Sequence, residues 1–474
     1  ECRAILLSKA SDNFKWSDIS PTIFGAVFES TLNPETRRSG GMHYTSIENI
    51  HKVIDPLFLE QLTMELSEIK SGTKNKKMKL QAYQEKLANL KFLDPACGSG
   101  NFLTETYLSL RRLENEVISE LIALEKGITI GQIILGTENI NPIKVSINQF
   151  YGIEINDFAV TVAKTALWIA ESQMMKETED IVHMNLDFLP LKTQAHIVEA
   201  NALRIDWETI VSNKELNYIM GNPPFVGMKY QTVLQKKDME NVFKDILNYG
   251  SLDYVASWYY KASLYIQNSQ IRVGFVSTNS ISQGEQVSIL WKPLFEKYSI
   301  KIDFAYQTFK WSSEVKEKAA VHCVIIGFSM SNVKCEKYIF TSGNRCNNVK
   351  NINPYLIDGS NVFVVSRTKP LCNVPKIIAG NKPVDGDFLK IEREDYENFI
   401  YHEPKAKQYI KKLIGAYEFI NNKERYVLWL VGVSPKEIKS MPLVYDRVNK
   451  VREARINMKD EGARKRESYI QIVP

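Results

Sequence analysis

The first indication of the fold is the stretch Phe92-Leu93-Asp94-Pro95-Ala96-Cys97-Gly98-Ser99-Gly100-Asn101-Phe102-Leu103. It reads as a short apolar strand, a turn that contains two glycines, and the start of a helix. Glycines at Gly98 and Gly100 allow a tight turn and let a ligand approach the backbone closely. The stretch therefore predicts a strand, a binding loop and a helix in direct succession.

Further apolar segments follow this strand, and helical patterns lie between most of them. The strand candidates are 91–93, 150–155, 197–200, 218–220, 271–277, 301–306 and 321–328, and the helical patterns are 103–113, 157–175 and 254–266. This alternation predicts a doubly wound α/β domain with a seven-stranded, mostly parallel sheet. In such sheets ligands bind beyond the carboxyl ends of the strands.

Other patterns flank the sheet. A helical pattern covers 21–32, and a second one begins after Ser46, which we expect to cap it. Beyond the sheet, helical patterns return at 404–413 and 441–466. We therefore expect a helical leader over 1–90, the sheet domain over 91–335 and the start of a second domain over 336–474.

The composition is that of a globular, water-soluble protein, with 44% apolar and 24% charged residues among 474. A net charge of +5 permits nucleic-acid binding without requiring it. The six cysteines are scattered without a Cys-x-x-Cys pair, so we expect reduced thiols, a cytoplasmic protein and no metal site. No segment approaches the ~20 apolar residues of a membrane helix, and no export signal is evident. Because the chain starts at Glu1 rather than Met, we expect it to be part of a longer one.

Polar residues follow four consecutive strand candidates. The first is followed by the glycine loop, and the next two end in Gly152-Ile153-Glu154-Ile155-Asn156 and Ala200-Asn201-Ala202-Leu203. A carboxylate such as Glu154 can accept hydrogen bonds from both hydroxyls of a ribose, and the Asn201 amide can read an adenine edge. The glycine loop lacks the lysine of a phosphate-binding loop and contains the acidic Asp94. It therefore suits a cofactor with a positive charge rather than phosphates.

The fourth strand candidate ends in Asn222-Pro223-Pro224-Phe225. The prolines fix the backbone and offer no N–H, so this cluster exposes hydrogen-bond acceptors, including the side-chain carbonyl of Asn222. Such acceptors suit a planar amine, whose ring can stack on Phe225. Taken singly, each of these features also fits an ordinary turn, a helix cap or a surface acid. It is the ordered set that favours a functional site.

The ordered set resembles the S-adenosylmethionine-dependent DNA methyltransferases that act on adenine N6, and among them the MmeI-like type II restriction and modification enzymes. The resemblance extends to Gly41–Ser46, Thr308–Ser312, Lys318–His322, Gly380–Pro383 and Phe419–Asn422. It implies the Rossmann-like class I methyltransferase fold, S-adenosyl-L-methionine as cofactor and double-stranded DNA as substrate. It also implies a nuclease domain and a full recognition domain elsewhere in a longer chain.

The resemblance also assigns roles to single residues. The catalytic motif would be Asn222, Pro223, Pro224 and Phe225, and the cofactor would meet His43, Tyr44, Thr45, Asp94, Pro95, Ala96, Gly98, Gly100, Asn101, Phe102, Glu154, Ile155, Asn201 and Ala202. The flipped base would stack on Phe225 and on either Phe309 or Trp311. By the same resemblance, asparagine rather than serine at position 222 favours adenine N6 over cytosine N4.

Two other functions fit the same catalytic motif. One is a methyltransferase that acts on a protein glutamine or on a guanine amine in RNA, since both offer a planar amine. The other is a noncatalytic specificity module that binds DNA and cofactor without turnover. The upstream motif and the long trailing region count against the first alternative, and the intact Asn222–Phe225 motif counts against the second.

Overall fold

The computed structural model describes residues 45–124, 142–183, 186, 194–310, 321–341, 344–346, 349–375 and 384–457. These residues form two compact units that divide between Arg367 and Thr368, here called unit 1 and unit 2. The helical pattern at 21–32 lies outside the described residues. Within them, no helix is long and apolar enough to cross a membrane.

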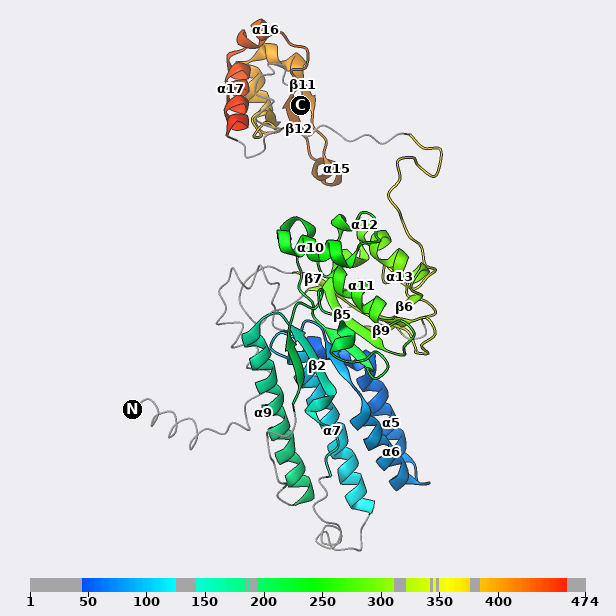
Figure 1. Cartoon of the computed structure of the whole chain (residues 1–474). Helices are drawn as coiled ribbons and strands as arrows, with labels where there is room; N and C mark the ends of the chain where they lie inside the picture. Colours follow the sequence, from blue (N-terminus) through cyan, green and yellow to red (C-terminus); the bar gives the residue numbers. More distant parts are fainter. Residues whose placement is uncertain are drawn as a thin grey trace, which may run out of the picture. The chain divides into compact units, whose positions relative to one another are not determined.

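A nine-stranded sheet forms the centre of unit 1 (Figure 1). Its strands are β1 (Phe92–Asp94), β2 (Phe150–Glu154), β3 (His196–Glu199), β4 (Tyr218–Gly221), β5 (Arg272–Thr278), β6 (Ile300–Lys310), β7 (His322–Met330), β8 (Tyr338–Thr341) and β9 (Asn344–Cys346). They lie in the order β3-β2-β1-β4-β5-β7-β6-β8-β9. The first five are parallel, and β7 runs antiparallel between β5 and β6. The predicted mostly parallel α/β sheet is confirmed, with all seven predicted strands in it.

The last two strands lie beyond residue 335, where the sequence places the end of the sheet domain. β8 pairs parallel with β6, and β9 pairs antiparallel with β8. The predicted boundary therefore falls inside unit 1. The sequence pattern does not reveal this extension, because both strands are short and lie in a turn-rich region.

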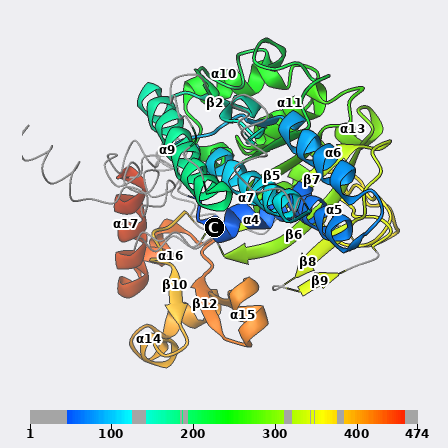
Figure 2. The same ribbon diagram turned by 90° about the horizontal axis from the view of Figure 1, so that it is seen from below.

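Helices cover both faces of the sheet. The helical elements are α4 (Ile47–Ile54), η3 (Asp55–Leu59), α5 (Glu60–Ser71), α6 (Lys76–Asn89), α7 (Asn101–Leu124), η4 (Ile147–Gln149), α9 (Asp157–Val182), η5 (Trp207–Thr209), η6 (Met228–Tyr230), α10 (Val233–Val242), η7 (Tyr249–Ser251), α11 (Ala256–Tyr265), η8 (Asn279–Ser282), α12 (Gly284–Gln286), η9 (Val287–Trp291) and α13 (Lys292–Glu296). Helices α5, α6, α7 and α9 lie side by side in both ribbon views (Figures 1 and 2). Helices α10 and α11 pack against each other elsewhere in the unit.

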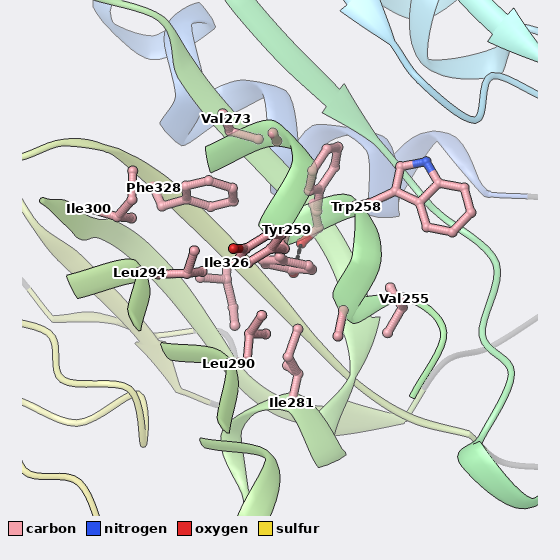
Figure 3. Packing of buried hydrophobic residues seen from close by; sticks show 14 of the residues in the cluster. Val255, Trp258, Tyr259, Val273, Ile281, Leu290, Leu294, Ile300, Ile326 and Phe328 are labelled. Atoms are coloured by element: carbon pink, nitrogen blue, oxygen red, sulfur yellow. Dashed lines mark hydrogen bonds between the residues drawn. The ribbon is translucent and has the colours of Figure 1, made fainter. Parts of the chain in front are cut away.

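Two hydrophobic clusters fill the spaces between sheet and helices. Successive strand residues point to opposite faces, so Ile325 belongs to the cluster beneath α4–α9 and Ile326 to the cluster around α11. Figure 3 shows the second cluster, where Tyr259 of α11 lies among aliphatic side chains. Its hydroxyl donates a hydrogen bond to the carbonyl of Phe275 at 3.1 Å, so the buried phenol is satisfied.

The leader helices are hydrogen-bonded to Arg272, the first residue of β5. The Arg272 guanidinium donates hydrogen bonds to the carbonyls of Pro56, at 3.2 Å, and Leu57, and it pairs with Asp303 at 3.4 Å. At the start of α4, the expected cap at Ser46 is wrong in one respect. Ser46 occupies the N-cap position, but its side chain makes no capping hydrogen bond, and only its backbone carbonyl receives the Ile50 N–H at 3.0 Å.

Unit 2 is built on a three-stranded antiparallel sheet in the order β10-β12-β11. Its elements are β10 (Lys390–Glu392), α14 (Tyr396–His402), η10 (Pro404–Tyr409), β11 (Ile410–Lys412), α15 (Ala416–Asn421), β12 (Arg425–Leu428), α16 (Pro435–Lys439) and α17 (Pro442–Ile456). The predicted helix at 404–413 is wrong, because this stretch forms a 3-10 helix followed by a strand that pairs with β12. The pattern at 441–466 corresponds to α17 as far as Ile456, and its end lies outside the described residues.

Candidate active site

The four polar strand ends lie next to one another at one edge of the sheet. Because β3, β2, β1 and β4 are neighbours and parallel, their carboxyl ends meet there. Asp94 at the end of β1 pairs in register with Gly152, and Glu154 at the end of β2 pairs with Glu199. The structure thus brings together the glycine loop, Glu154, Asn201 and Asn222, as the sequence predicts.

The glycine loop has a backbone that other residues adopt only with strain. Gly98 has φ of +52° and Gly100 has φ of +81°, both in the left-handed region. A Cβ on Gly100 would lie 2.9 Å from the Cβ of Ala163 in α9, so the loop packs directly on that helix. The N–H of Gly98 donates to Glu154 Oε2 at 2.9 Å, which ties the loop to the end of β2.

Asp94 is a buried carboxyl group directly before this loop. It is 1% exposed, and its Oδ1 accepts a hydrogen bond from the Ala96 N–H at 3.0 Å. Burial, together with the nearby Glu154, raises its pKa to about 8. A Cβ on Gly221 would lie 2.5 Å from Asp94 Oδ1, so only a glycine lets β4 approach this carboxyl group so closely.

Glu154 is held by three backbone N–H groups. Its Oε1 accepts from Ile155 at 2.9 Å and from Asn156 at 3.0 Å, and its Oε2 accepts from Gly98. Burial raises the pKa of Glu154, although these hydrogen bonds oppose the shift. A carboxylate has about four acceptor positions, so one remains on Oε2. In this conformation Glu154 can accept a hydrogen bond from one hydroxyl group without losing a hydrogen bond from a backbone N–H. Ile155, the next residue in the chain, is exposed.

The Asn201 side chain is engaged within the protein. Its Oδ1 accepts from the Leu203 N–H at 2.9 Å, and its Nδ2 donates to Asp238 Oδ2 at 3.1 Å. Ala202 is 5% exposed, and its carbonyl accepts from the indole N–H of Trp207 at 2.9 Å. The amide predicted to read an adenine edge is therefore a structural link in this conformation.

Asp238 of α10 is a buried acid at this site that the sequence analysis missed. Besides Asn201, it accepts hydrogen bonds from Arg204 Nε at 2.7 Å and from the Tyr254 hydroxyl at 3.1 Å. The sequence offers no signal for it, because Asp238 follows two lysines in a helix and resembles a solvated surface residue.

The catalytic motif holds an acceptor for which the described part of the chain provides no partner. Asn222 Nδ2 donates to the hydroxyl of Thr45 at 3.1 Å. Asn222 Oδ1 is buried and has no hydrogen-bond partner among the described residues. Such an unpaired carbonyl costs about 1 to 3 kcal/mol, so it marks a position where a donor is expected. Pro223 is buried beside it, and half-buried Phe225 packs against both hydrophobic clusters.

Thr45 connects the leader to the catalytic motif across 177 residues of sequence. The resemblance assigns Thr45 to the cofactor, and the structure places its hydroxyl against Asn222. Thr45 is 4% exposed, so this contact is shielded from water. His43 and Tyr44, the other expected cofactor residues of this segment, lie outside the described residues.

The remaining predicted residues occupy different environments. Phe309 lies near the carboxyl end of β6, is half-buried, and has Lys52 Nζ of α4 at 5.2 Å from its ring centroid. Trp311 lies outside the described residues. Asn101 and Phe102 begin α7 and are buried, and the Pro95 carbonyl accepts from the indole N–H of Trp258 at 3.1 Å.

The charges at this edge suit a cationic ligand. Within the described residues, neither Asp94 nor Glu154 forms an ion pair with a lysine, arginine or histidine, although both are buried. Buried acids without a cation are costly, and a positively charged ligand would offset that cost. The described residues contain no group of three or more His, Cys, Asp or Glu side chains arranged to hold a metal ion.

Comparison with known proteins gives two family matches. Residues 70–341 match the family described as "MmeI, DNA-methyltransferase domain", and residues 358–470 match "MmeI, target recognition domain". DNA methyltransferase A of Bacillus subtilis (strain 168) is 42% identical over 463 residues, which cover 97% of this chain and 51% of that protein. The chain thus spans about half the length of this curated relative.

A solved structure is also similar. It is that of the Type IIL restriction-modification enzyme MmeI in complex with DNA, with a TM-score of 0.83 and 43% sequence identity. The match covers 98% of this chain and 61% of that one.

Proposed function

The chain belongs to the MmeI family of DNA methyltransferases, and we propose that it transfers the methyl group of S-adenosylmethionine to the N6 amine of a flipped-out adenine in duplex DNA. The observation that carries this proposal is Asn222 Oδ1, a buried acceptor at a strand end beside the glycine loop that has no hydrogen-bond partner among the described residues. An exocyclic amine provides the donor that this acceptor lacks.

The residues at the sheet edge fit a positively charged cofactor. When bound, S-adenosylmethionine supplies a methyl group on a positively charged sulfur. A cationic ligand would stabilise the ionised forms of the buried Asp94 and Glu154 carboxyl groups. The Gly98–Gly100 turn would let the ligand approach the backbone, and Glu154 Oε2 would keep one acceptor position for a ribose hydroxyl. Asn201, Ala202 and Phe102 would support this pocket from the core rather than through free polar side-chain atoms.

The catalytic motif would act on the target amine. Asn222 Oδ1 and the Pro223 carbonyl would each accept a hydrogen bond from one N6–H, which draws the nitrogen lone pair out of conjugation with the ring. The nitrogen would form a bond to the methyl carbon as the bond from that carbon to the cofactor sulfur breaks, its electron pair remaining on sulfur. The methylated amine would then lose one proton to solvent. Phe225 would stack on one face of the flipped base, and Phe309 or Trp311 would be the other wall.

We assign catalysis to unit 1 and target recognition to unit 2, which contains most of the target-recognition match. We further propose that the full protein belongs to a restriction-modification system and carries its nuclease elsewhere in the chain. A cytoplasmic location is part of this proposal, because Cys97, Cys323, Cys335 and Cys372 are free thiols.

The test is a transfer assay with the full-length protein. Purified protein is mixed with labelled S-adenosylmethionine and, separately, with duplex DNA, transfer RNA or a glutamine-containing peptide. We expect the wild type to label the duplex DNA, and digestion of that DNA should release the label as N6-methyladenine. The Asn222→Ala variant should not label the DNA. The matched control is Asn89→Ala, because Asn89 is an exposed α6 residue whose side chain donates a hydrogen bond within its own helix, at 2.8 Å to the Glu85 carbonyl. Label in RNA or peptide alone, or only N4-methylcytosine in DNA, would overturn the proposal.

A further inference from the structure

The connection between β11 and β12 presents an unusually apolar tip. Residues 413–424 form this connection and include the short helix α15 (Figure 1). Four large apolar side chains on it are exposed, namely Ile414 at 69%, Tyr417 at 59%, Phe419 at 81% and Ile420 at 76%. Apolar residues gathered in this way mark interaction surfaces more often than free surface.

The tip is braced from the inside. Glu418 is 4% exposed, accepts a hydrogen bond from the Gly415 N–H at 2.8 Å and pairs with Arg425 at 2.7 Å. Asn421 Nδ2 donates to the Tyr417 carbonyl at 2.9 Å. Because these contacts hold the helical turn in place, Phe419 and Ile420 are presented outward on a formed element. Binding through them would require little ordering of the backbone.

The segment of sequence that contains the tip is strongly basic. Residues 405–425 contain six cations and two acids, a net charge of +4, whereas the whole chain carries only +5. Both acids, Glu418 and Glu424, already pair with cations of unit 2. Protein interfaces are depleted of lysine, whereas nucleic-acid surfaces combine basic clusters with exposed aromatic side chains. The charge therefore favours a nucleic acid as the partner.

We propose that Phe419 and Ile420 form an apolar wedge that inserts between base pairs of duplex DNA, while lysines near the tip contact the phosphates. Apolar wedges partly unstack a base step and bend the duplex. This inference rests on the proposed function, since it takes duplex DNA as the substrate. It adds a contact that depends on DNA deformability rather than on base-edge hydrogen bonds.

Equilibrium binding by the full-length protein tests this wedge. Phe419→Ala is expected to weaken duplex binding by on the order of tenfold to 100-fold, with the slope of log K against log salt unchanged. Lys407→Ala, which changes an exposed lysine of the same basic segment, is expected to reduce that slope by about 1. Phe419→Trp retains an aromatic wedge and should bind like the wild type. Tyr401→Ala is the control, because Tyr401 of α14 is 80% exposed outside the tip.

Two further measurements separate the alternatives. Energy transfer between dyes at the duplex ends should report bending with the wild type and less bending with Phe419→Ala. Unchanged affinity of Phe419→Ala would overturn the wedge. A melting temperature several degrees lower for DNA-free Phe419→Ala would also overturn it, because the tip would then be packing against protein. The proposed function is judged separately, by methyl transfer from the wild type, and Phe419→Ala should still methylate at saturating DNA.

Discussion

Replacing Asp94 by asparagine should change the pH dependence of stability in a specific direction. Asp94 has a pKa of about 8 in the folded protein, against an ordinary value of 3.8. A carboxyl group whose pKa is raised on folding imposes no penalty below its ordinary pKa. As the pH rises from 3.8 towards 8, the folded state loses stability relative to the unfolded state, because Asp94 ionises in the unfolded chain while burial keeps it protonated in the folded protein.

The size of this effect follows from the shift. Each pH unit between the two pKa values costs about 1.4 kcal/mol, so the penalty reaches about 4 kcal/mol at pH 7. Asparagine is neutral at every pH and keeps an Oδ1 that can accept from the Ala96 N–H. We expect the buried Nδ2 of this asparagine to lack a hydrogen-bond acceptor, which costs about 1 to 3 kcal/mol. Without cofactor, Asp94→Asn should therefore be less stable than the wild type near pH 4 and more stable by about 2 kcal/mol at pH 7.

Urea unfolding of the cofactor-free protein at several pH values measures this reversal, and calorimetric titration measures S-adenosylmethionine binding. A positively charged cofactor favours the ionised carboxylate, so wild-type affinity should rise with pH up to about 8, and Asp94→Asn should lose both affinity and this pH dependence. Asp206→Asn is the control, because Asp206 is an exposed cap of η5 whose replacement can still accept from the Glu208 N–H. If Asp94→Asn were the less stable protein at pH 8, the reasoning would be refuted.

Three further changes probe the same edge. Thr45→Val should slow methyl transfer by roughly 10- to 100-fold and leave cofactor affinity unchanged, because the valine cannot orient the Asn222 amide. Thr45→Ser should restore the rate. If Thr45→Val weakened cofactor binding as much as it slowed transfer, Thr45 would instead be a cofactor-binding residue. Gly100→Ala should lower the free energy of unfolding by about 1 to 3 kcal/mol, because the φ of Gly100 is +81° and the new Cβ would lie 2.9 Å from the Cβ of Ala163. Denaturant titration measures this, and an unchanged free energy of unfolding would contradict the described packing. Asp238→Ala should lower the melting temperature and raise the KM for S-adenosylmethionine more than it lowers kcat, because Asn201 would lose its hydrogen bond to Asp238. Steady-state kinetics in which only kcat falls would exclude a role of Asp238 in positioning Asn201.

The sequence anticipates those parts of the fold that depend on local patterns. The seven strands and the glycine loop can be predicted, because short apolar segments and the glycines Gly98 and Gly100 determine the backbone conformation within a few residues of themselves. Contacts across long stretches of sequence are not readable in this way. The bond between Thr45 and Asn222 and the anchor at Asp238 depend on how distant segments pack.

Short elements are misread for a related reason. The segment 404–413 has apolar residues at helical spacing, but Ile410–Lys412 gains more from pairing with β12 than from continuing a helical turn. Likewise, β8 has only four residues and is stabilised by its pairing with β6. In both places tertiary pairing outweighs local preference.

The position of β7 has a consequence for how unit 1 is made. β7 lies between β5 and β6 although it follows both in sequence, so β6 cannot join the sheet until residues 322–330 have been synthesised. At about 5 to 20 residues per second, the ribosome needs roughly 3 to 10 s to travel from Thr278, the end of β5, to Met330, the end of β7. During this interval β5 has an open edge that can pair with another nascent chain. Synthesis of this protein therefore includes a period in which chaperone protection of one strand edge matters most.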